Sequence, residues 1–231
     1  MPSAELNGTV IVTGGASGLG AAVAGAVEAA GGTPVVLDVN PPPNGFHFER
    51  VDLSDTRAAE AVVERVAEAG GPLRGVVTAA GTDACGRLDD VPADTWERVV
   101  AVNLLGTAAV VRAALPHLER SGGRVVTVAS TLGLKAVGDA TAYCASKFGV
   151  VGFTRALAAE TAGRVGVTLL IPGGMQTAFF DGRTEQYKPP PDAKLAPPDE
   201  IAAGVVFALS RPPEVELREL VMAVPTEPSW P

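Results

Sequence analysis

Tyr143 and Lys147 are the residues whose types and spacing most directly suggest chemistry, since they stand four positions apart in a segment of helical composition. Side chains at that spacing share one face of a helix. The ammonium would favour ionisation of the phenol, because a nearby opposite charge stabilises the charged form. Tyrosine titrates near pH ~10, so a neutral pKa requires about 4 kcal/mol of stabilisation. One lysine in water cannot supply this stabilisation, so a catalytic pair implies a second positive charge or a dry site. The alternative is a surface Tyr and Lys that merely share a helix face.

A glycine-rich turn gives the second chemical signal. It lies between an apolar run and an alanine-rich segment, and it reads Thr13-Gly14-Gly15-Ala16-Ser17-Gly18-Leu19-Gly20. Such glycines allow a tight turn, let backbone amides approach a pyrophosphate and let the helix pack closely on the sheet. The helix N-terminus adds partial positive charge without a lysine. The G-K-[ST] ending of nucleoside triphosphate loops is absent, and the strand, turn, helix and strand context predicts dinucleotide binding, where an isolated turn would be only a loop.

Asp38 stands at the end of the next apolar run, eighteen residues after Gly20. A carboxylate there can accept hydrogen bonds from the ribose hydroxyls of NAD and would repel the additional phosphate of NADP. Neither the turn nor the residues directly after Asp38 contain an arginine or lysine for that phosphate. The pattern favours NAD; the alternative is an aspartate that serves only as a turn residue.

Apolar runs that alternate with helical segments must position these residues. The predicted strands are short β-branched or apolar runs, namely Val10–Val12, Val35–Leu37, Phe46–Val51, Val76–Thr78, Val125–Val128, Val167–Ile171 and Leu220–Val224. The predicted helices cover residues 18–31, 55–70, 94–120, 141–163 and 199–210. Strands buried on both faces are typical of parallel sheets. We therefore expect one doubly wound α/β domain over residues 1–231, with about seven parallel strands and helices on both faces.

Asn103 is an anomaly within the predicted helix 94–120, because it lies on the same apolar stripe as Val99, Val100 and Val111. Its amide therefore points inward, where it needs hydrogen-bond partners or costs about 1–3 kcal/mol. A satisfied structural asparagine and a residue of the tyrosine site both fit this position.

Composition argues against several classes of partner. Lys plus Arg is 18 and Asp plus Glu is 26, so the formal net charge is −8, without a long block of one sign. Nucleic acid and anionic membranes attract clustered cations, so neither is expected as a partner. No apolar run of about 18–20 residues stands out, and Met1 to Leu6 lacks a leader pattern, so a cytoplasmic protein is expected. The two cysteines and two histidines lack metal-ligand spacing, so no metal centre is expected.

Together these motifs resemble the short-chain dehydrogenase/reductase family, in its ordinary short form, over nearly the whole chain. The motifs that carry the resemblance occur in the family's order and are Thr13 to Gly20, Asp52-Leu53, Thr78-Ala79-Ala80-Gly81, Asn103, Ser130, Tyr143 to Lys147, and Pro172-Gly173 followed by Thr177. Their joint occurrence is far more specific than any one of them. The resemblance implies a Rossmann-type domain and an oxidoreductase that transfers a hydride between NAD(H) and a secondary alcohol or ketone.

The resemblance also implies roles for individual residues. Tyr143 would be the general acid/base, Lys147 would lower its pKa together with the cationic nicotinamide ring, and Ser130 would hydrogen-bond the substrate oxygen. The backbone at Asn103 would hold a water that extends a proton path from Lys147. The residues expected to contact the cofactor are Gly14, Ser17, Gly18, Leu19, Gly20, Asp38, Asp52, Leu53, Ala79, Ala80, Gly81, Tyr143, Lys147, Pro172, Gly173 and Thr177.

Two departures from the family pattern stand out. Thr78 occupies a position that is most often asparagine, so the hydrogen bonds that steady the central sheet must be made differently, at a cost in stability more than in chemistry. The C-terminal residues lack the glycine-rich finish common in tetrameric members. We expect a homodimer through helices 94–120 and 141–163, with a homotetramer as the alternative. Trp230 would pack on a partner or on its own chain.

Specificity for a small-molecule alcohol or ketone is expected from the segment 174–198 and from residues after Ser130. The expected lining is mostly apolar and comprises Thr131, Leu132, Leu134, Val137, Met175, Phe179, Phe180 and Tyr187. It favours an uncharged or partly apolar substrate over a phosphorylated sugar, although Arg183 and Lys188 leave an anion possible. The segment itself is expected to form a lid, with disorder as the alternative. Cys85 and Cys144 are expected to be packing residues and not nucleophiles.

Two other functions stay open at this point. A dinucleotide-binding regulatory or scaffold protein would keep the fold without turnover, although the complete set of Asn103, Ser130, Tyr143 and Lys147 argues against it. An NAD-using epimerase or dehydratase of sugar nucleotides usually has a differently spaced glycine turn and more chain after the position of Pro172.

Overall fold

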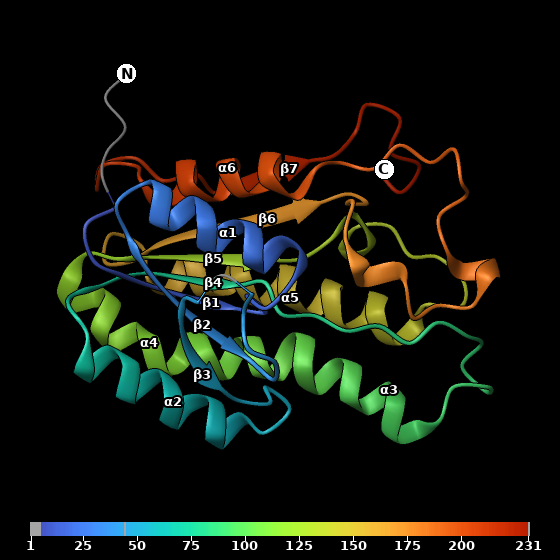
Figure 1. Ribbon diagram of the computed structural model, residues 1–231, viewed down its shortest axis with the longest axis horizontal. Helices are drawn as coiled ribbons and strands as arrows, with labels where there is room; N and C mark the ends of the chain where they lie inside the picture. The colour runs from blue at the N-terminus through green and yellow to red at the C-terminus, as the bar shows by residue number, and fades with distance from the viewer. Residues whose placement is uncertain (1–5, 44, 231) are drawn as a thin grey trace.

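Seven parallel strands form the central sheet of the computed structural model, which describes residues 6–43 and 45–230. The strands are β1 (Thr9–Thr13), β2 (Thr33–Asp38), β3 (His47–Arg50), β4 (Leu73–Thr78), β5 (Arg124–Val128), β6 (Gly166–Pro172) and β7 (Glu219–Met222). Their order across the sheet is β3-β2-β1-β4-β5-β6-β7 (Figure 1). Each predicted apolar run overlaps one strand, which confirms the parallel sheet. The residues considered for a leader pattern lie mostly outside the described ranges, as do the two ends of the expected domain 1–231.

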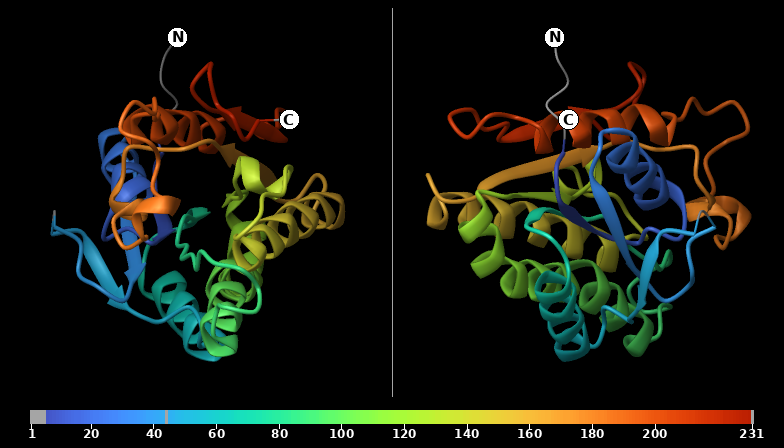
Figure 2. Two further views of the ribbon diagram at one scale, coloured as in Figure 1. Left: turned by 90° about the vertical axis from the view of Figure 1, so that its right-hand side faces the viewer. Right: turned by 60° about the vertical axis from the view of Figure 1, so that its left-hand side comes forward.

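Helices cover both faces of this sheet (Figures 1 and 2). Helices α1 (Gly18–Ala29) and α6 (Pro198–Leu209) pack on one face, and α2 (Thr56–Ala69), α4 (Thr107–Ser121) and α5 (Thr141–Glu160) pack on the other. Val10 and Val12 of β1 join the core beneath α1 and α6, whereas Ile11 between them joins the core beneath α2 and α4. Burial on both faces is the reason that the strand is apolar at consecutive positions. The predicted doubly wound α/β domain is therefore confirmed.

The predicted helix 94–120 differs from expectation in its middle. Helix α3 (Ala93–Val100) continues into a π-helical segment, η1 (Ala101–Gly106), and then into α4. A π-helical turn is wider than an α-helical turn and often marks a functional site. The whole span, Ala93–Ser121, is also long and apolar enough to resemble a membrane span, which the sequence reading overlooked. It is half buried and α4 packs against α2 and β4, so it serves as a core helix.

The carboxyl ends of the strands meet at one edge of the sheet, because all the strands run in the same direction. This edge brings together the segments that directly follow β1, β2, β4, β5 and β6 (Figure 2, left). The connection from β6 to α6 contains two short 3₁₀ turns, Ala178–Phe180 and Glu185–Tyr187, and lies at the same end of the molecule (Figure 1). Ligands of open parallel sheets bind at this edge, so the fold itself points to it.

Candidate active site

A cavity of about 1170 Å³ opens at the carboxyl edge of the sheet. All the residues predicted to contact the cofactor line it, from the glycine turn to Thr177. Ser130, Tyr143 and Lys147 line the cavity as well, whereas Asn103 is not among its lining residues. The sequence motifs, which span more than 150 residues between Gly14 and Thr177, are therefore gathered around one space.

The glycine turn requires glycine at several positions. Gly14 and Gly18 have φ values of +71° and +53°, which disfavour side chains with a Cβ. A Cβ on Gly20 would lie 2.1 Å from the carbonyl oxygen of Gly14. The Ser17 side chain makes no capping hydrogen bond to α1 within the described chain, so the first amides of the helix lack a side-chain acceptor. Free amides at a helix N-terminus fit the pyrophosphate of a dinucleotide.

Asp38 is held against this turn by its own hydrogen bonds. One carboxylate oxygen accepts the backbone N–H of Ala16 at 3.0 Å, and the other accepts that of Asn40 at 3.0 Å. Each oxygen keeps a lone pair for a ribose hydroxyl. Sequence reasoning missed Arg50, which comes from β3 and donates a hydrogen bond to the carbonyl of Val39 at 2.5 Å. The register partner of Asp38 is Arg50, and that pairing could be foreseen only from the sheet order.

Asp52 is engaged by a second residue that the sequence did not indicate. Its carboxylate accepts hydrogen bonds from Ser54 at 2.8 Å and from Arg98 at 2.9 Å. Burial acts to raise the pKa of Asp52, but the hydrogen bonds from Ser54 and Arg98 outweigh it and lower the pKa. Arg98 also lines the cavity, so this ion pair borders the region expected to receive adenine.

Tyr143 and Lys147 lie on one face of α5, as their spacing predicts. The ammonium nitrogen of Lys147 is 5.6 Å from the centre of the Tyr143 ring and donates a hydrogen bond to the carbonyl of Val128 at 2.9 Å. Burial raises the pKa of Tyr143 to about 12, and a hydrogen bond with the Ser130 hydroxyl acts in the opposite direction. The idea that a dry site would assist ionisation was therefore wrong, because low polarity disfavours the charged phenolate.

Burial also disfavours the charged form of the neighbouring Lys147 side chain, which is the ammonium. It lowers the pKa of Lys147 to about 8, since the side chain is only 4 % exposed. The amine therefore keeps its positive charge at neutral pH. With burial raising the pKa of Tyr143, a second positive charge is the one of the two expected aids to ionisation that would still favour the phenolate.

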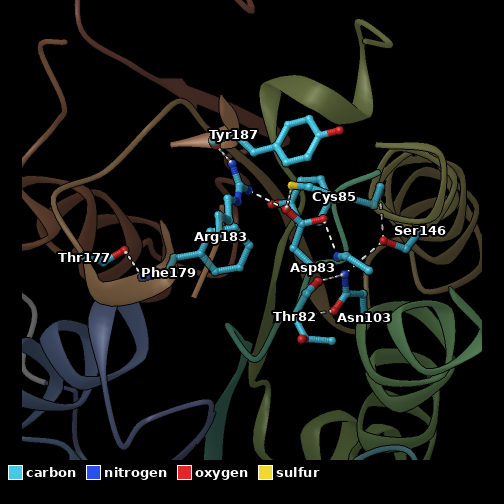
Figure 3. A network of polar contacts seen from close by, with 11 residues as sticks. Thr82, Asp83, Cys85, Asn103, Ser146, Thr177, Phe179, Arg183 and Tyr187 are labelled. Carbon is cyan, nitrogen blue, oxygen red and sulfur yellow. Dashed lines mark hydrogen bonds and ion pairs between the residues drawn. The ribbon is translucent and has the colours of Figure 1, made fainter. Parts of the chain in front are cut away.

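Asn103 lies in the π-helical segment and is 1 % exposed. Its side-chain oxygen accepts the N–H of Thr82 at 2.8 Å, while its amide nitrogen donates to the Thr82 carbonyl at 2.9 Å and to the Ser146 hydroxyl at 3.0 Å (Figure 3). The inward orientation agrees with the sequence pattern. Through these bonds Asn103 ties the turn after β4 to α5, the helix that carries Tyr143 and Lys147.

Comparison with known proteins decides the family. The family described as short chain dehydrogenase matches residues 8–188 of the chain. The protein belongs to this family. Its glycine turn, its Tyr143–Lys147 pair and its seven-stranded parallel sheet are the features that the sequence reading had linked to it.

Several members with assigned names are similar over most of their length. D-threitol dehydrogenase of Mycolicibacterium smegmatis is 35% identical over 227 residues, covering 89% of this chain and 87% of that protein. The 2-dehydro-3-deoxy-L-rhamnonate dehydrogenase (NAD(+)) of a Sphingomonas species is 36% identical over 182 residues, covering 74% and 73%. A putative NAD(P)-dependent gluconate 5-dehydrogenase of Beutenbergia cavernae, solved with bound NADP, is 31% identical with a TM-score of 0.83, covering 95% and 96%. All three are dehydrogenases, which makes this short-chain dehydrogenase an oxidoreductase.

Thr78, where this short-chain dehydrogenase departs from the family pattern, leaves a polar atom unpaired. Its hydroxyl is buried without a hydrogen-bond partner among the described residues. The turn after β4 is held instead by Thr13, whose hydroxyl accepts the N–H of Ala80 at 3.1 Å. The expected alternative hydrogen bonding is thus made from β1.

Most of the residues expected to surround the substrate line the cavity, together with one segment that was not expected there. Thr131, Leu132, Met175, Phe179, Phe180 and Tyr187 line it, whereas Leu134 and Val137 do not. The addition is the C-terminal segment 226–229, which sequence reasoning did not assign to the site. Glu227 accepts the N–H of Gly174 at 2.9 Å, and the hydroxyls of Ser229 and Thr131 lie 2.6 Å apart. No local pattern announces these contacts, because they join residues about 50 and 100 positions apart.

Arg183 and Lys188, the two residues named above as candidates for binding an anion, both have acidic partners. Arg183 pairs with Asp83, and Lys188 pairs with Glu185. Figure 3 shows Arg183 reaching from its own segment to Asp83. Cys85 donates to the same carboxylate at 3.2 Å, and burial together with Asp83 raises the pKa of this thiol to about 11. A protonated thiol fits the expected packing role better than a nucleophile.

Proposed function

We propose that this short-chain dehydrogenase is an NAD-dependent enzyme that interconverts a secondary alcohol and its ketone. The observation that carries the proposal is the meeting of Ser130, Tyr143 and Lys147 in the same cavity as the glycine turn. The nicotinamide ring, when bound, accepts or donates the hydride. In this proposal the Tyr143 phenol, the Ser130 hydroxyl and the buried Lys147 ammonium surround the reacting oxygen of the substrate.

Each of these side chains has a distinct task in the proposed reaction. Tyr143 exchanges the proton of the substrate hydroxyl, and Ser130 hydrogen-bonds the same oxygen. Lys147 remains charged at neutral pH and stabilises the phenolate form of Tyr143. Asn103 supports this arrangement by linking α5 to the turn after β4, and its backbone carbonyl is our candidate for a water-bound proton path from Lys147.

The choice of NAD over NADP rests on Asp38. Its carboxylate is fixed at the turn by two backbone amides and would repel a phosphate on the adenosine ribose. The Sphingomonas relative is named as an NAD(+) enzyme, whereas the Beutenbergia structure contains NADP, so the relatives do not decide between them. Arg50 is the residue that would favour NADP, but its guanidinium already binds the Val39 carbonyl.

Assembly and location belong to the proposal as well. Leu105 on η1 and Phe148 on α5 are about half exposed, which supports a homodimer through these helices, with a tetramer as the larger alternative. Cys85 and Cys144 are both free thiols, which suits a reducing cytoplasm. Trp230 is exposed to the same extent as Phe148 and is a further candidate for a partner contact.

A panel of secondary alcohols with NAD⁺ and with NADP⁺, followed by absorbance of the reduced cofactor, tests this function. We expect NADH formation from part of the panel. Tyr143→Phe should keep NAD⁺ affinity within about twofold while turnover falls at least about a hundredfold. Equal turnover by Tyr143→Phe would reject the proposed proton transfer. NAD⁺ binding without turnover of any alcohol or ketone would favour the regulatory protein instead.

A further inference from the structure

The Asp83–Arg183 pair is far more shielded from water than the Asp52–Arg98 pair, which also borders the cavity. The side chains of Asp83 and Arg183 are 8% and 19% exposed, and they come from positions 100 residues apart. The other charged residues of the segment 174–198 that line the cavity are Asp192 and Lys194, and both are exposed to solvent. A shielded ion pair is costly to build, so its place beside the reacting residues calls for an explanation.

Asp83 is fixed by its own loop. One carboxylate oxygen accepts the N–H of Ala84 at 2.7 Å, and the other accepts the Cys85 thiol at 3.2 Å in addition to Arg183. These bonds hold the carboxylate in place whether or not the guanidinium stays. If Arg183 turned to a negatively charged substrate, Asp83 would remain shielded from water without its cation and close to a second negative charge.

Some N–H donors of Arg183 make no hydrogen bond within the described residues. Its guanidinium stacks on Phe179 and Phe180, at 5.3 Å and 4.7 Å from the ring centres, and one terminal nitrogen donates to the carbonyl of Tyr187 at 3.2 Å. Its Nε is buried and has no hydrogen-bond partner among the described residues. An unpaired buried donor is unfavourable by about 1–3 kcal/mol, and a neutral acceptor such as a hydroxyl oxygen would satisfy it.

The pair also lies close to the reacting centre. Phe179, which carries the guanidinium on its face, is 5.8 Å from the ring of Tyr143. Asp83 and Arg183 act on the Tyr143 phenol in opposite directions, so their charges offset each other there. A hydroxyl group bound by the pair would therefore belong to the same small molecule whose carbon reacts near Tyr143.

We propose that the Asp83–Arg183 pair selects neutral polyhydroxy substrates, namely diols and polyols, and disfavours carboxylates. This inference rests on the proposed function and names the substrate class of that same site. Arg183 donates to a substrate hydroxyl oxygen, and Asp83 can accept the proton of a hydroxyl, so a neutral alcohol is matched at both ends of the pair. A carboxylate can use only the donors and meets Asp83 as a like charge.

A four-carbon series tests the selection directly. The compounds are 2-butanol, 2,3-butanediol and 1,2,3-butanetriol, which gain one hydroxyl at each step, and 3-hydroxybutyrate, which carries a carboxylate. For the wild-type protein with NAD⁺ and with NADP⁺, we expect kcat/KM for the diol or triol to exceed that for 2-butanol by at least about tenfold. We expect 3-hydroxybutyrate to be the poorest substrate.

Two variants should change this ranking in different ways. Asp83→Asn leaves Arg183 without its partner and should improve 3-hydroxybutyrate relative to 2-butanol by at least about tenfold. Arg183→Met keeps an apolar contact with the two phenylalanines and should abolish the advantage of the diol and triol, while 3-hydroxybutyrate stays poor. Glu185→Gln removes an exposed ion pair of the same segment and serves as the control, with the ranking unchanged. Thermal unfolding confirms that each variant is folded.

Binding to the cofactor-loaded Tyr143→Phe protein, measured by NMR with the same four compounds, separates specificity from turnover. If the compounds bind in the expected order but the wild type turns none over, the proposed reaction fails and the selection by Asp83 and Arg183 stands. If the diol, triol and 2-butanol bind equally well, or if Arg183→Met keeps the preference, the selection is overturned. A wild-type preference for 3-hydroxybutyrate overturns it too, because Arg183 would then bind an anion.

Discussion

The half of the cavity that we propose for the cofactor and the half that we propose for the substrate are built in different ways. The cofactor half consists of the glycine turn, Asp38 and the turn at residues 79–81, and its shape comes mainly from backbone at the ends of parallel strands. The substrate half consists of Asp83, the segment 174–198 and the C-terminal segment 226–229. Side chains hold these pieces together across long stretches of sequence, as in the contact of Arg183 with Asp83. We therefore expect that substitutions in the substrate half can change substrate choice without disturbing the central sheet.

The largest effect is expected where the two halves meet, at Lys147. Lys147→Met should lower turnover by at least about a hundredfold, because the phenolate of Tyr143 loses its nearby cation. The same change should stabilise the fold at pH 7, because it removes a buried ammonium whose pKa is depressed from 10.5 to about 8. We expect a gain of about 1–3 kcal/mol in the free energy of unfolding, after the lost hydrogen bond to Val128 is counted.

Urea unfolding at several pH values checks the sign of this effect. Between pH 8 and 10.5 the unfolded wild-type chain holds a proton on Lys147 that the folded chain has released. Wild-type stability should therefore rise with pH relative to the variant over that interval, and the advantage of Lys147→Met should shrink. A variant that is less stable than wild type at pH 7 and equally so at pH 10 would contradict this account.

Asp38→Asn tests whether cofactor choice can change without a change in substrate choice. Loss of the negative charge should shift the ratio of NADP to NAD affinity toward NADP by about tenfold. The ranking of alcohol substrates should not change, because Asp38 ends β2 and Arg183 follows β6, with three strands of the sheet between them. Dissociation constants for both cofactors provide the measurement.

Asp55→Asn provides the matched control for this substitution. Asp55 caps α2 near the same edge of the sheet, and asparagine caps equally well, so the cofactor ratio should stay constant. A substrate ranking that moves with Asp38→Asn would show that the two halves are coupled.

Tyr187→Phe is the corresponding test on the substrate side, with a smaller effect. It removes the hydrogen bond from the Tyr187 hydroxyl to Asp139 at 3.1 Å while keeping the ring. We expect KM for the alcohol to rise by about two- to fivefold, because one hydrogen bond that holds the segment is lost. NAD affinity, measured by titration, should be unaffected; a parallel loss of NAD affinity would show that this segment also shapes the cofactor half.

The smallest effect concerns the sheet that both halves share. Thr78 and Thr127 are register partners on β4 and β5, but the Thr78 hydroxyl is unpaired among the described residues, whereas that of Thr127 lies 2.6 Å from the hydroxyl of Thr154. Thr78→Val should leave stability unchanged or raise it by up to about 1 kcal/mol, and Thr127→Val should lower it by about 1 kcal/mol. Equal losses in urea unfolding of the two variants would mean that Thr78 has a partner after all.

Local patterns in the sequence were sufficient for the sheet, the glycine turn and the Tyr143–Lys147 pair. Strands buried on both faces are mostly apolar at consecutive positions, and a turn with positive φ values favours glycine, so both leave contiguous signals. The spacing of Tyr143 and Lys147 follows from the helical repeat alone. The direction in which the Tyr143 pKa shifts does not follow from this spacing, because the burial of the side chain depends on elements distant in the sequence.

Only the tertiary structure decided how the substrate half is assembled. Arg183 and Lys188 looked equivalent in the sequence, yet Arg183 crosses to Asp83 and Lys188 stays with its neighbour Glu185. Arg50 reaches the end of β2 because β3 is the strand beside it, a fact of strand order. Periodicity and spacing report what a residue does within its own element. Contacts between loops depend on where each loop leaves the sheet, which strand order decides. The residues that form these contacts have no local sequence pattern.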